Sequence, residues 1–173
     1  MCSENRGANI VFIFFQKVFS GKKRVFKKTA NSLLLFLSQR ITILHLSDII
    51  NMVKVQFEYL IKCSPKVLFN RLSTASGLAE WFADDVHVRG KQYTFVWEGS
   101  EQVAEMTLRK QNRLVRFNWV DDPGSYFEFK ISQVELRGDV ALIVADHCEE
   151  DETEGTEELW NAQIADLKHI LGS

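Results

Sequence analysis

The sequence predicts an α+β fold in which a curved antiparallel sheet of about seven strands wraps around a long C-terminal helix, with two short helices after the first strand. Three observations lead to this prediction. Segments of alternating apolar and polar residues follow one another from residue 85 to residue 148, hairpin-sized turns separate them, and an amphipathic helix pattern follows. Such short connections force neighbouring strands to pair antiparallel.

The chain of 173 residues changes composition at Met52. Residues 1–51 carry eight Lys and Arg against two Asp and Glu, whereas residues 52–173 carry thirteen against twenty-one. All four Trp, all three Tyr and both Pro lie in the second part. We therefore expect residues 52–173 to be the folded domain and residues 1–51 to be a basic N-terminal extension that is disordered or not part of the native fold.

Charge and cysteine content exclude several classes of protein. The apolar runs of the extension are shorter than the roughly 18 residues that a membrane-spanning helix needs, so no membrane span is expected. The basic cluster between Lys22 and Lys28 leaves open a contact with phosphates or an anionic membrane surface. The acidic balance of residues 52–173 opposes nucleic-acid binding by the folded domain. Three widely spaced cysteines indicate neither a disulfide framework nor a zinc site, which favours a cytoplasmic setting.

The first strand and the short helices come next in the chain. Residues 53–61 alternate with period two, as a half-buried strand does. Ser64 then supplies a helix N-cap and Pro65 a first helical residue, and this helix is expected to end near Ser73. Residues 76–82 allow a second short helix.

Six further strands are predicted over residues 85–89, 91–98, 102–110, 113–120, 126–135 and 139–148. Their alternation gives one apolar face and one solvated face. The apolar face is expected to hold Tyr93, Phe95, Trp97, Ala104, Met106, Leu108, Val115, Phe117, Trp119, Phe127, Phe129, Ile131, Leu142 and Val144.

The last helix is expected to start from Thr156 as its N-cap, after an acidic loop at residues 149–158. Its apolar stripe comprises Trp160, Ile164, Leu167 and Leu171. A helix of about fifteen residues is roughly 22 Å long, which is enough to cover the apolar face of the sheet. The acidic loop is interpreted as a solvated loop and helix cap, with a basic partner as the alternative.

The sequence offers little support for catalysis, and it suggests no metal or cofactor. It contains no nucleophile elbow, P-loop, zinc-protease motif or dinucleotide fingerprint. His147 and Cys148 are neighbours on a strand and point to opposite faces, so they cannot pair as base and nucleophile. Asp85 and His87 share a face, but they lack a convincing third metal ligand.

Asp146 is the polar candidate that the pattern places inside, because it continues the inward series of Leu142 and Val144. A buried carboxylate requires hydrogen bonds. The partner is either a group of the protein, such as the Trp160 indole or a tyrosine hydroxyl, or a ligand. Structural, ligand-binding and acid–base roles stay open at this point.

The order of these elements resembles the START-like superfamily, whose helix-grip fold wraps a curved sheet around a C-terminal helix. The matching residues are Ser64-Pro65 followed by Val67 and Phe69, the run Gly77 to Phe82, and Leu159-Trp160 with Leu167-Lys168 and Leu171. The most similar branch resembles the activator of heat-shock-protein-90 ATPase homologues. The resemblance covers about residues 53–171 and implies a deep cavity between sheet and helix, which members use for lipids, sterols, polyketides or hormones.

We therefore expect residues 52–173 to be a START-like domain that binds an apolar or amphipathic small molecule, such as a lipid, without catalysing a reaction. One alternative is a co-chaperone-like module whose partner is a chaperone or another protein. Another is a polyketide-cyclase-like enzyme with Asp146 as acid or base. The candidate ligand-binding residues are Trp81, Phe82, Phe95, Trp97, Phe117, Trp119, Phe129, Asp146, Trp160 and Ile164.

Overall fold

The computed structural model describes residues 52–133 and 139–173. The predicted N-terminal extension lies outside these residues, so its character stays a prediction. The elements follow in the order β1 (Met52–Ile61), α3 (Pro65–Ser73), α4 (Ala75–Leu78), β2 (Asp85–Arg89), β3 (Gln92–Trp97), β4 (Ser100–Lys110), β5 (Leu114–Trp119), β6 (Tyr126–Gln133), β7 (Val140–Glu149), a 3-10 turn (Glu150–Glu152) and α5 (Thr153–Leu171).

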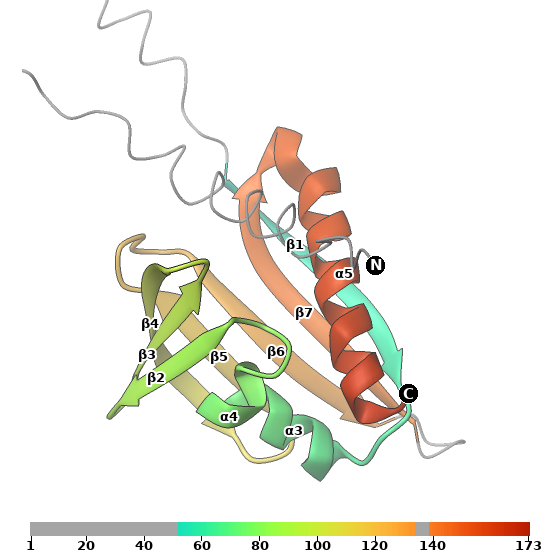
Figure 1. The fold of residues 1–173 in the computed structure, drawn as a ribbon. Coiled ribbons are helices and arrows are strands. Elements are labelled where there is room, and N and C mark those ends of the chain that lie inside the picture. Colours follow the sequence, from blue (N-terminus) through green and yellow to red (C-terminus); the bar gives the residue numbers. More distant parts are fainter. Residues whose placement is uncertain (1–51, 134–138) are drawn as a thin grey trace, which may run out of the picture.

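The seven strands form one antiparallel sheet in the order β1-β7-β6-β5-β4-β3-β2. The first strand therefore pairs with the last one, and the other strands follow as successive hairpins. Figure 1 shows the sheet curving, with α5 over β1 and β7 and with α3 and α4 beside the middle of the sheet. This architecture confirms the predicted α+β fold.

The two short helices begin as their capping residues predict, but the second is shorter than expected. The Ser64 hydroxyl accepts the Val67 N–H at 3.3 Å, and the Thr74 hydroxyl accepts the Gly77 N–H at 3.1 Å. Helix α4 ends at Leu78, and the amides of Trp81, Phe82 and Ala83 then share the Leu78 carbonyl instead of continuing a regular helix ladder. The prediction of a helix over residues 76–82 was therefore wrong at its C-terminal end.

The apolar face of the sheet is predicted correctly except at a bulge in β4. Met106 pairs with Phe117, but Leu108 pairs with Arg116, so the register shifts between Met106 and Leu108. One extra residue in a strand reverses the alternation that follows it. Leu108 was predicted to face inward and instead shares the outer face with Arg116. Arg109 takes the inward position, and its guanidinium lies 5.3 Å from the centroid of the Phe69 ring.

Helix α5 has 19 residues and begins at Thr153, so the prediction of Thr156 as N-cap was wrong. Thr156 lies inside the helix, where its hydroxyl donates to the Glu152 carbonyl at 2.9 Å. The apolar stripe is confirmed, since Trp160, Ile164 and Leu167 are buried against the sheet and Leu171 is half-buried. Within residues 52–133 and 139–173, no helix combines the length and the apolar character needed to cross a membrane.

Candidate functional site

The space between the sheet and α5 is occupied by a continuous group of aromatic side chains, which we call the ring cluster. At its centre lies Phe82, whose ring centroid is 5.2 Å from those of Phe95 and Phe127 and 5.9 Å from that of Trp160. The cluster consists of Trp81, Phe82, Tyr93, Phe95, Trp97, Phe117, Trp119, Phe127, Phe129 and Trp160.

Every aromatic residue of the predicted site belongs to this cluster. The structure adds Tyr93 and Phe127, which the sequence placed on the apolar face without assigning them to the site. Phe127 contacts the rings of both Phe117 and Trp119, at 4.9 and 5.0 Å. The same alternation that identified Phe129 could have identified Phe127, two residues earlier on β6.

Hydrogen bonds to backbone carbonyls hold several rings in a fixed orientation. The Trp97 indole donates to the Phe82 carbonyl at 2.7 Å, and the Trp81 indole donates to the Arg71 carbonyl at 3.2 Å. The Tyr93 hydroxyl donates to the Ser73 carbonyl at 3.1 Å, and burial raises the pKa of that hydroxyl against the opposing effect of Arg109. The polar edges of these rings are therefore bonded within the chain.

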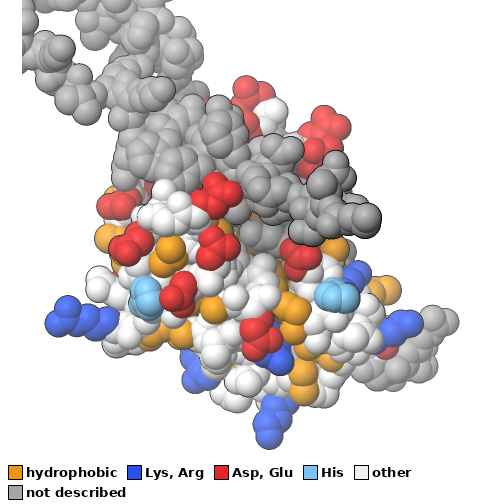
Figure 2. All heavy atoms as spheres, in the orientation of Figure 1, with side chains coloured by type: hydrophobic (Ala, Val, Ile, Leu, Met, Phe, Trp, Pro, Cys, Tyr) orange, Lys and Arg blue, Asp and Glu red, His pale blue; other side chains and the backbone are white. Residues whose placement is uncertain are grey.

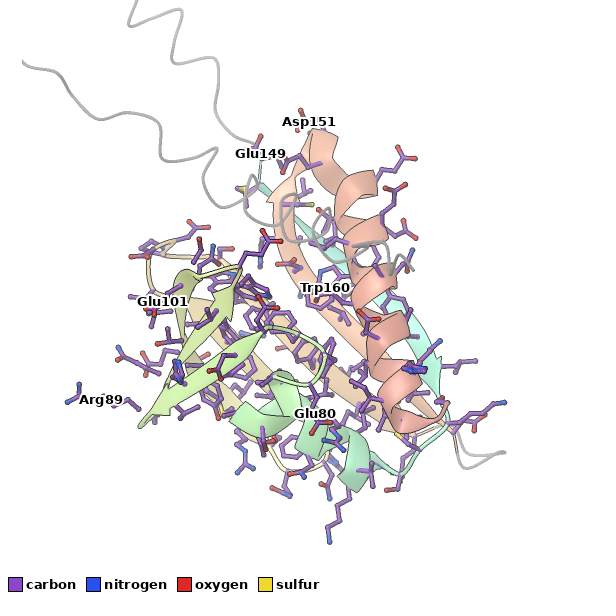
Figure 3. All side chains as sticks on the ribbon, viewed as in Figure 1. Glu80, Arg89, Glu101, Glu149, Asp151 and Trp160 are labelled. Carbon is purple, nitrogen blue, oxygen red and sulfur yellow. The ribbon has the colours of Figure 1, made fainter. Side chains whose placement is uncertain are left out.

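Asp146 faces inward from β7, as its sequence position indicates, and its side chain is only 6% exposed. Its Oδ2 accepts the indole N–H of Trp160 at 3.0 Å, and its Oδ1 accepts the His147 N–H at 2.8 Å. Figure 3 shows Trp160 between α5 and the strands. Asp146 therefore ties α5 to β7, and the Trp160 indole is the partner that we considered from the sequence. Ile164, one turn further along α5, is also buried.

The ring cluster approaches the surface at Trp119, which is half-buried whereas the other predicted aromatic residues are buried. Trp119 pairs with Ala104 across the sheet, and Ala104 is fully buried. Gln102 is two residues away on the same strand and pairs with Phe95. This corner of the sheet is therefore a partly exposed rim of the aromatic interior.

Two glutamines with buried amide oxygens, one on β4 and one on α5, were not predicted from the sequence. Among the described residues, the buried side-chain oxygens that lack a hydrogen-bond partner are Oε1 of Gln102 and Oε1 of Gln163. Gln163 belongs to the buried side of α5, three residues after Trp160, and only 7% of its surface is exposed. The sequence places Gln163 next to the apolar stripe of α5, and this position was the available indication that it is buried. A glutamine beside such a stripe usually reaches solvent, however.

The candidate metal-binding and nucleophilic residues considered from the sequence lie outside the ring cluster. His87 Nε2 lies 3.6 Å from Asp85 Oδ2, and both side chains are more than half exposed. His147 and Cys148 point to opposite faces, as predicted: the His147 ring packs on Tyr126, while Cys148 is buried near Thr153. In the part of the chain that the structure describes, no three His, Cys, Asp or Glu residues converge in a way that could hold a metal ion.

Acidic side chains gather where α5 begins. Figure 2 shows Asp and Glu side chains in the upper and middle part of the visible face, whereas Lys and Arg side chains lie mainly at its sides and lower edge. Burial, together with the charges of Glu152 and Asp151, raises the pKa of Glu149. This end of the molecule therefore carries concentrated negative charge, in agreement with the acidic balance of residues 52–173.

Comparison with known proteins identifies the family. The model of the START-like superfamily domain matches residues 49–173. A solution structure from Bacteroides fragilis is 35% identical, has a TM-score of 0.53, and the match covers 69% of this chain and 91% of that one.

More distant structures share the fold. An Aha1 dimer from Colwellia psychrerythraea is 20% identical over 67% of this chain and 93% of that one, with a TM-score of 0.57. DynU16, described as a putative protein in the dynemicin biosynthetic locus, is 14% identical over 69% of this chain and 47% of that one, with a TM-score of 0.59. No curated protein matches the chain. The family match and the Bacteroides relative agree with the observed sheet and helix, and the chain belongs to the START-like superfamily.

Proposed function

We propose that this domain binds one apolar or amphipathic small molecule between its sheet and α5, with the ring cluster as the walls of the site. The observation that carries the proposal is the place of Phe82. Its ring is at the centre of the interior, yet it comes from the irregular segment at residues 79–84, which links α4 to β2. The START-like fold commonly binds hydrophobic ligands, which agrees with an aromatic interior.

The rings around Phe82 come from strands and a long helix, whereas Phe82 itself comes from a turn. Phe95, Phe127 and Phe129 project from paired strands, and Trp160 is bonded to Asp146. Residues 79–82 belong to no strand ladder. The Trp81, Phe82 and Ala83 amides of this segment share the Leu78 carbonyl in turn-type bonds, and turn segments open locally at a lower free-energy cost than paired strands do. Movement of this segment would withdraw the central ring and leave a space with aromatic walls.

Several contacts attach this segment to the rest of the domain, among them the indole bonds from Trp97 to the Phe82 carbonyl at 2.7 Å and from Trp81 to the Arg71 carbonyl at 3.2 Å. Glu80 forms an ion pair with Arg71 of α3, and both side chains are partly exposed. At its other end, Asp84 Oδ2 accepts the Glu98 N–H at 2.7 Å, and the Asp84 N–H donates to the Val96 carbonyl at 2.9 Å. Exposed ion pairs contribute little stability, at most about 1 kcal/mol. We therefore expect the segment to swing from its Asp84 end when a ligand enters.

Titration with 1-anilinonaphthalene-8-sulfonate, a dye that fluoresces in apolar surroundings, tests the proposal. We expect saturable binding with one site per chain. Phe82→Ala should bind the dye about tenfold more tightly, because the ligand no longer has to displace a ring. The matched control is Phe69→Ala, because Phe69 is also nearly fully buried but lies on α3 under Arg109. This control should bind the dye as the original protein does.

Both substitutions remove a buried ring and destabilise the protein, by about 3 to 5 kcal/mol. Circular dichroism must therefore show that each variant is folded, and Phe82→Leu provides a milder version of the same change. The proposal is contradicted if the folded original protein shows no saturable binding, or if Phe82→Ala and Phe82→Leu leave the affinity unchanged.

A protein-interaction module is the second candidate function. The observation that favours it is the closed state of the interior, where the rings contact one another and their polar edges bond to the chain's own carbonyls. An interior that never opens leaves only the surface for binding, and the dye would then fail to bind. The cyclase alternative receives less support, because both Asp146 oxygens accept hydrogen bonds from the protein.

A further inference from the structure

The Gln163 side chain is the starting point, because its amide oxygen is buried without a partner. The residue is 7% exposed, and no described group donates a hydrogen bond to its Oε1. An unsatisfied buried acceptor destabilises a protein by about 1 to 3 kcal/mol. Native structures retain few such groups, and those that remain are explained by a role in strain, in chemistry or in binding a water molecule or ligand.

The position of Gln163 connects it to the site. It follows Trp160 by three residues on α5, and side chains at this spacing lie next to each other on a helix. Trp160 stacks on Phe82 at 5.9 Å, with the two ring planes inclined by only 15°. Gln163 is therefore a neighbour along α5 of Trp160, the ring that stacks on Phe82.

Asp146 is less suited to receive the polar end of a ligand. Its Oδ2 already accepts from the Trp160 indole, and its Oδ1 accepts from the backbone of β7. Capture of a ligand by this carboxylate would compete with the bond that holds α5 to the sheet. Gln163 can accept a hydrogen bond without losing any bond that the described residues make.

We infer that the ligand of this site carries a neutral hydrogen-bond donor, such as a hydroxyl or an amide N–H, which Gln163 Oε1 accepts. The inference rests on the proposed function and makes it more specific. An amide oxygen has no charge to compensate a buried cation, so a protonated amine would lose its hydration without a counter-ion. The preferred ligand is therefore an apolar molecule with a hydroxyl or N–H group at one end. Gln102 Oε1, on β4, is a second buried acceptor of the same kind.

Two small probes of similar size test this inference in the full chain. 1-Naphthol has a hydroxyl donor, and 1-methylnaphthalene has a methyl group in its place. The measured quantity is the ratio of their dissociation constants, obtained by displacement of 1-anilinonaphthalene-8-sulfonate. We expect Gln163→Leu to shift this ratio about tenfold against 1-naphthol, because the variant keeps the side-chain volume and loses the acceptor. Gln56→Leu, an exposed position on β1, is the matched control and should leave the ratio unchanged.

Thermal unfolding of the same variant without a probe supplies an independent measurement. Replacement of an unsatisfied buried amide by an apolar side chain of similar size should raise the melting temperature. A glutamine that serves only the structure would show the opposite change, because its loss would remove a stabilising contact. A lower melting temperature for Gln163→Leu would therefore contradict the inference.

The possible binding outcomes separate the inference from the proposed function. If both probes bind and Gln163→Leu leaves their ratio unchanged, the function stands and the inference is wrong, as it would be if the oxygen served only a buried water molecule. If Gln102→Leu shifts the ratio and Gln163→Leu does not, the acceptor is Gln102 and the assignment to Gln163 is wrong. If neither probe nor the dye binds, the proposed function and the inference both fail.

Discussion

The buried polar residues of the domain differ in whether their side-chain oxygens have hydrogen-bond partners. Asp146 is buried with both carboxylate oxygens hydrogen-bonded, and its bond to Trp160 links β7 with α5. On the outer face, Glu128 is similarly buried but forms a close ion pair with Arg116. The unsatisfied Gln163 Oε1 stands out against these residues. An interior that satisfies a carboxylate and leaves an amide oxygen without a partner is better suited to a neutral donor than to a charged ligand.

Tyr59 supplies a residue-scale prediction about pH. Its hydroxyl donates to Asn161 Oδ1 at 3.0 Å, and burial, followed by the charge of Glu157, raises the pKa of Tyr59 to about 12. An unfolded tyrosine ionises near pH 10, so between about pH 10 and 12 the unfolded chain releases a proton that the folded chain keeps. The stability that Tyr59 contributes is therefore complete below about pH 10 and is lost as the pH rises toward 12.

Urea unfolding at pH 8 and pH 11 measures this effect. The original protein should lose more stability between the two pH values than Tyr59→Phe does. The difference between the alkaline absorbance titrations of the two proteins should report the ionisation of Tyr59 at a pH well above 10. The electrostatic account of Tyr59 fails if that difference titrates near pH 10 or if both proteins show the same loss.

Among the elements, the two helical regions use glycine in different ways. A Cβ added to Gly77 of α4 would lie 2.6 Å from the Asn70 carbonyl oxygen and 2.7 Å from the Arg71 Cα. Such distances are shorter than van der Waals contact, so the absence of a side chain allows α4 to lie against α3. At Gly155, near the start of α5, no described atom lies within 4 Å of an added Cβ. Gly155 therefore only weakens the helix, because glycine has a low helix propensity.

The corresponding prediction is a pair of alanine substitutions with opposite signs. Gly155→Ala should raise the free energy of unfolding by about 0.5 to 1 kcal/mol, the usual gain in a helix interior. Gly77→Ala should lower it by about 1 to 3 kcal/mol, because the new methyl group overlaps with the backbone of α3. Urea unfolding of both variants measures the two changes. Equal signs for the two variants would refute this account of the helices.

The element boundaries show which features the sequence could predict. The alternation of apolar residues located every strand, because burial on one face of a sheet imposes period two. The same alternation missed the bulge at Met106 and Leu108, since two apolar residues at this spacing are equally typical of an unbroken strand. The start of α5 was placed too late because its N-cap is Glu152, which makes no side-chain capping bond, so residue type does not mark this helix start.

Across the whole molecule, the candidate site lies between α5, which is bonded to β7, and the irregular segment that follows α4. The pairing of β1 with β7 and the bond from Asp146 to Trp160 fix α5 against one side of the sheet. The opposite wall includes the irregular segment at residues 79–84, which carries Trp81 and Phe82 (Figure 1). A ligand that enters the interior would therefore move this segment rather than α5.

The site was predictable to the extent that it consists of apolar side chains. The inward alternation and the helix stripe identified aromatic rings that contact one another in the structure. The burial of the Gln163 amide oxygen without a partner was not predictable, because hydropathy treats a glutamine as a surface residue and contains no information on hydrogen-bond partners. The central position of Phe82 could not be predicted from the sequence either, since it depends on how the chain turns after Leu78.

The indole N–H signals of the four tryptophans, observed by ¹⁵N–¹H NMR during titration with 1-naphthol, test the central claim most directly. Our account predicts that the signal of Trp97 shifts strongly, because its indole bonds to the Phe82 carbonyl, and that the signal of Trp160 shifts as the ring stacked on it withdraws. The shifts should saturate with one ligand per chain. Unchanged indole signals at saturating 1-naphthol, or shifts confined to amides of the outer face around Tyr126 and His147, would contradict ligand binding between the sheet and α5.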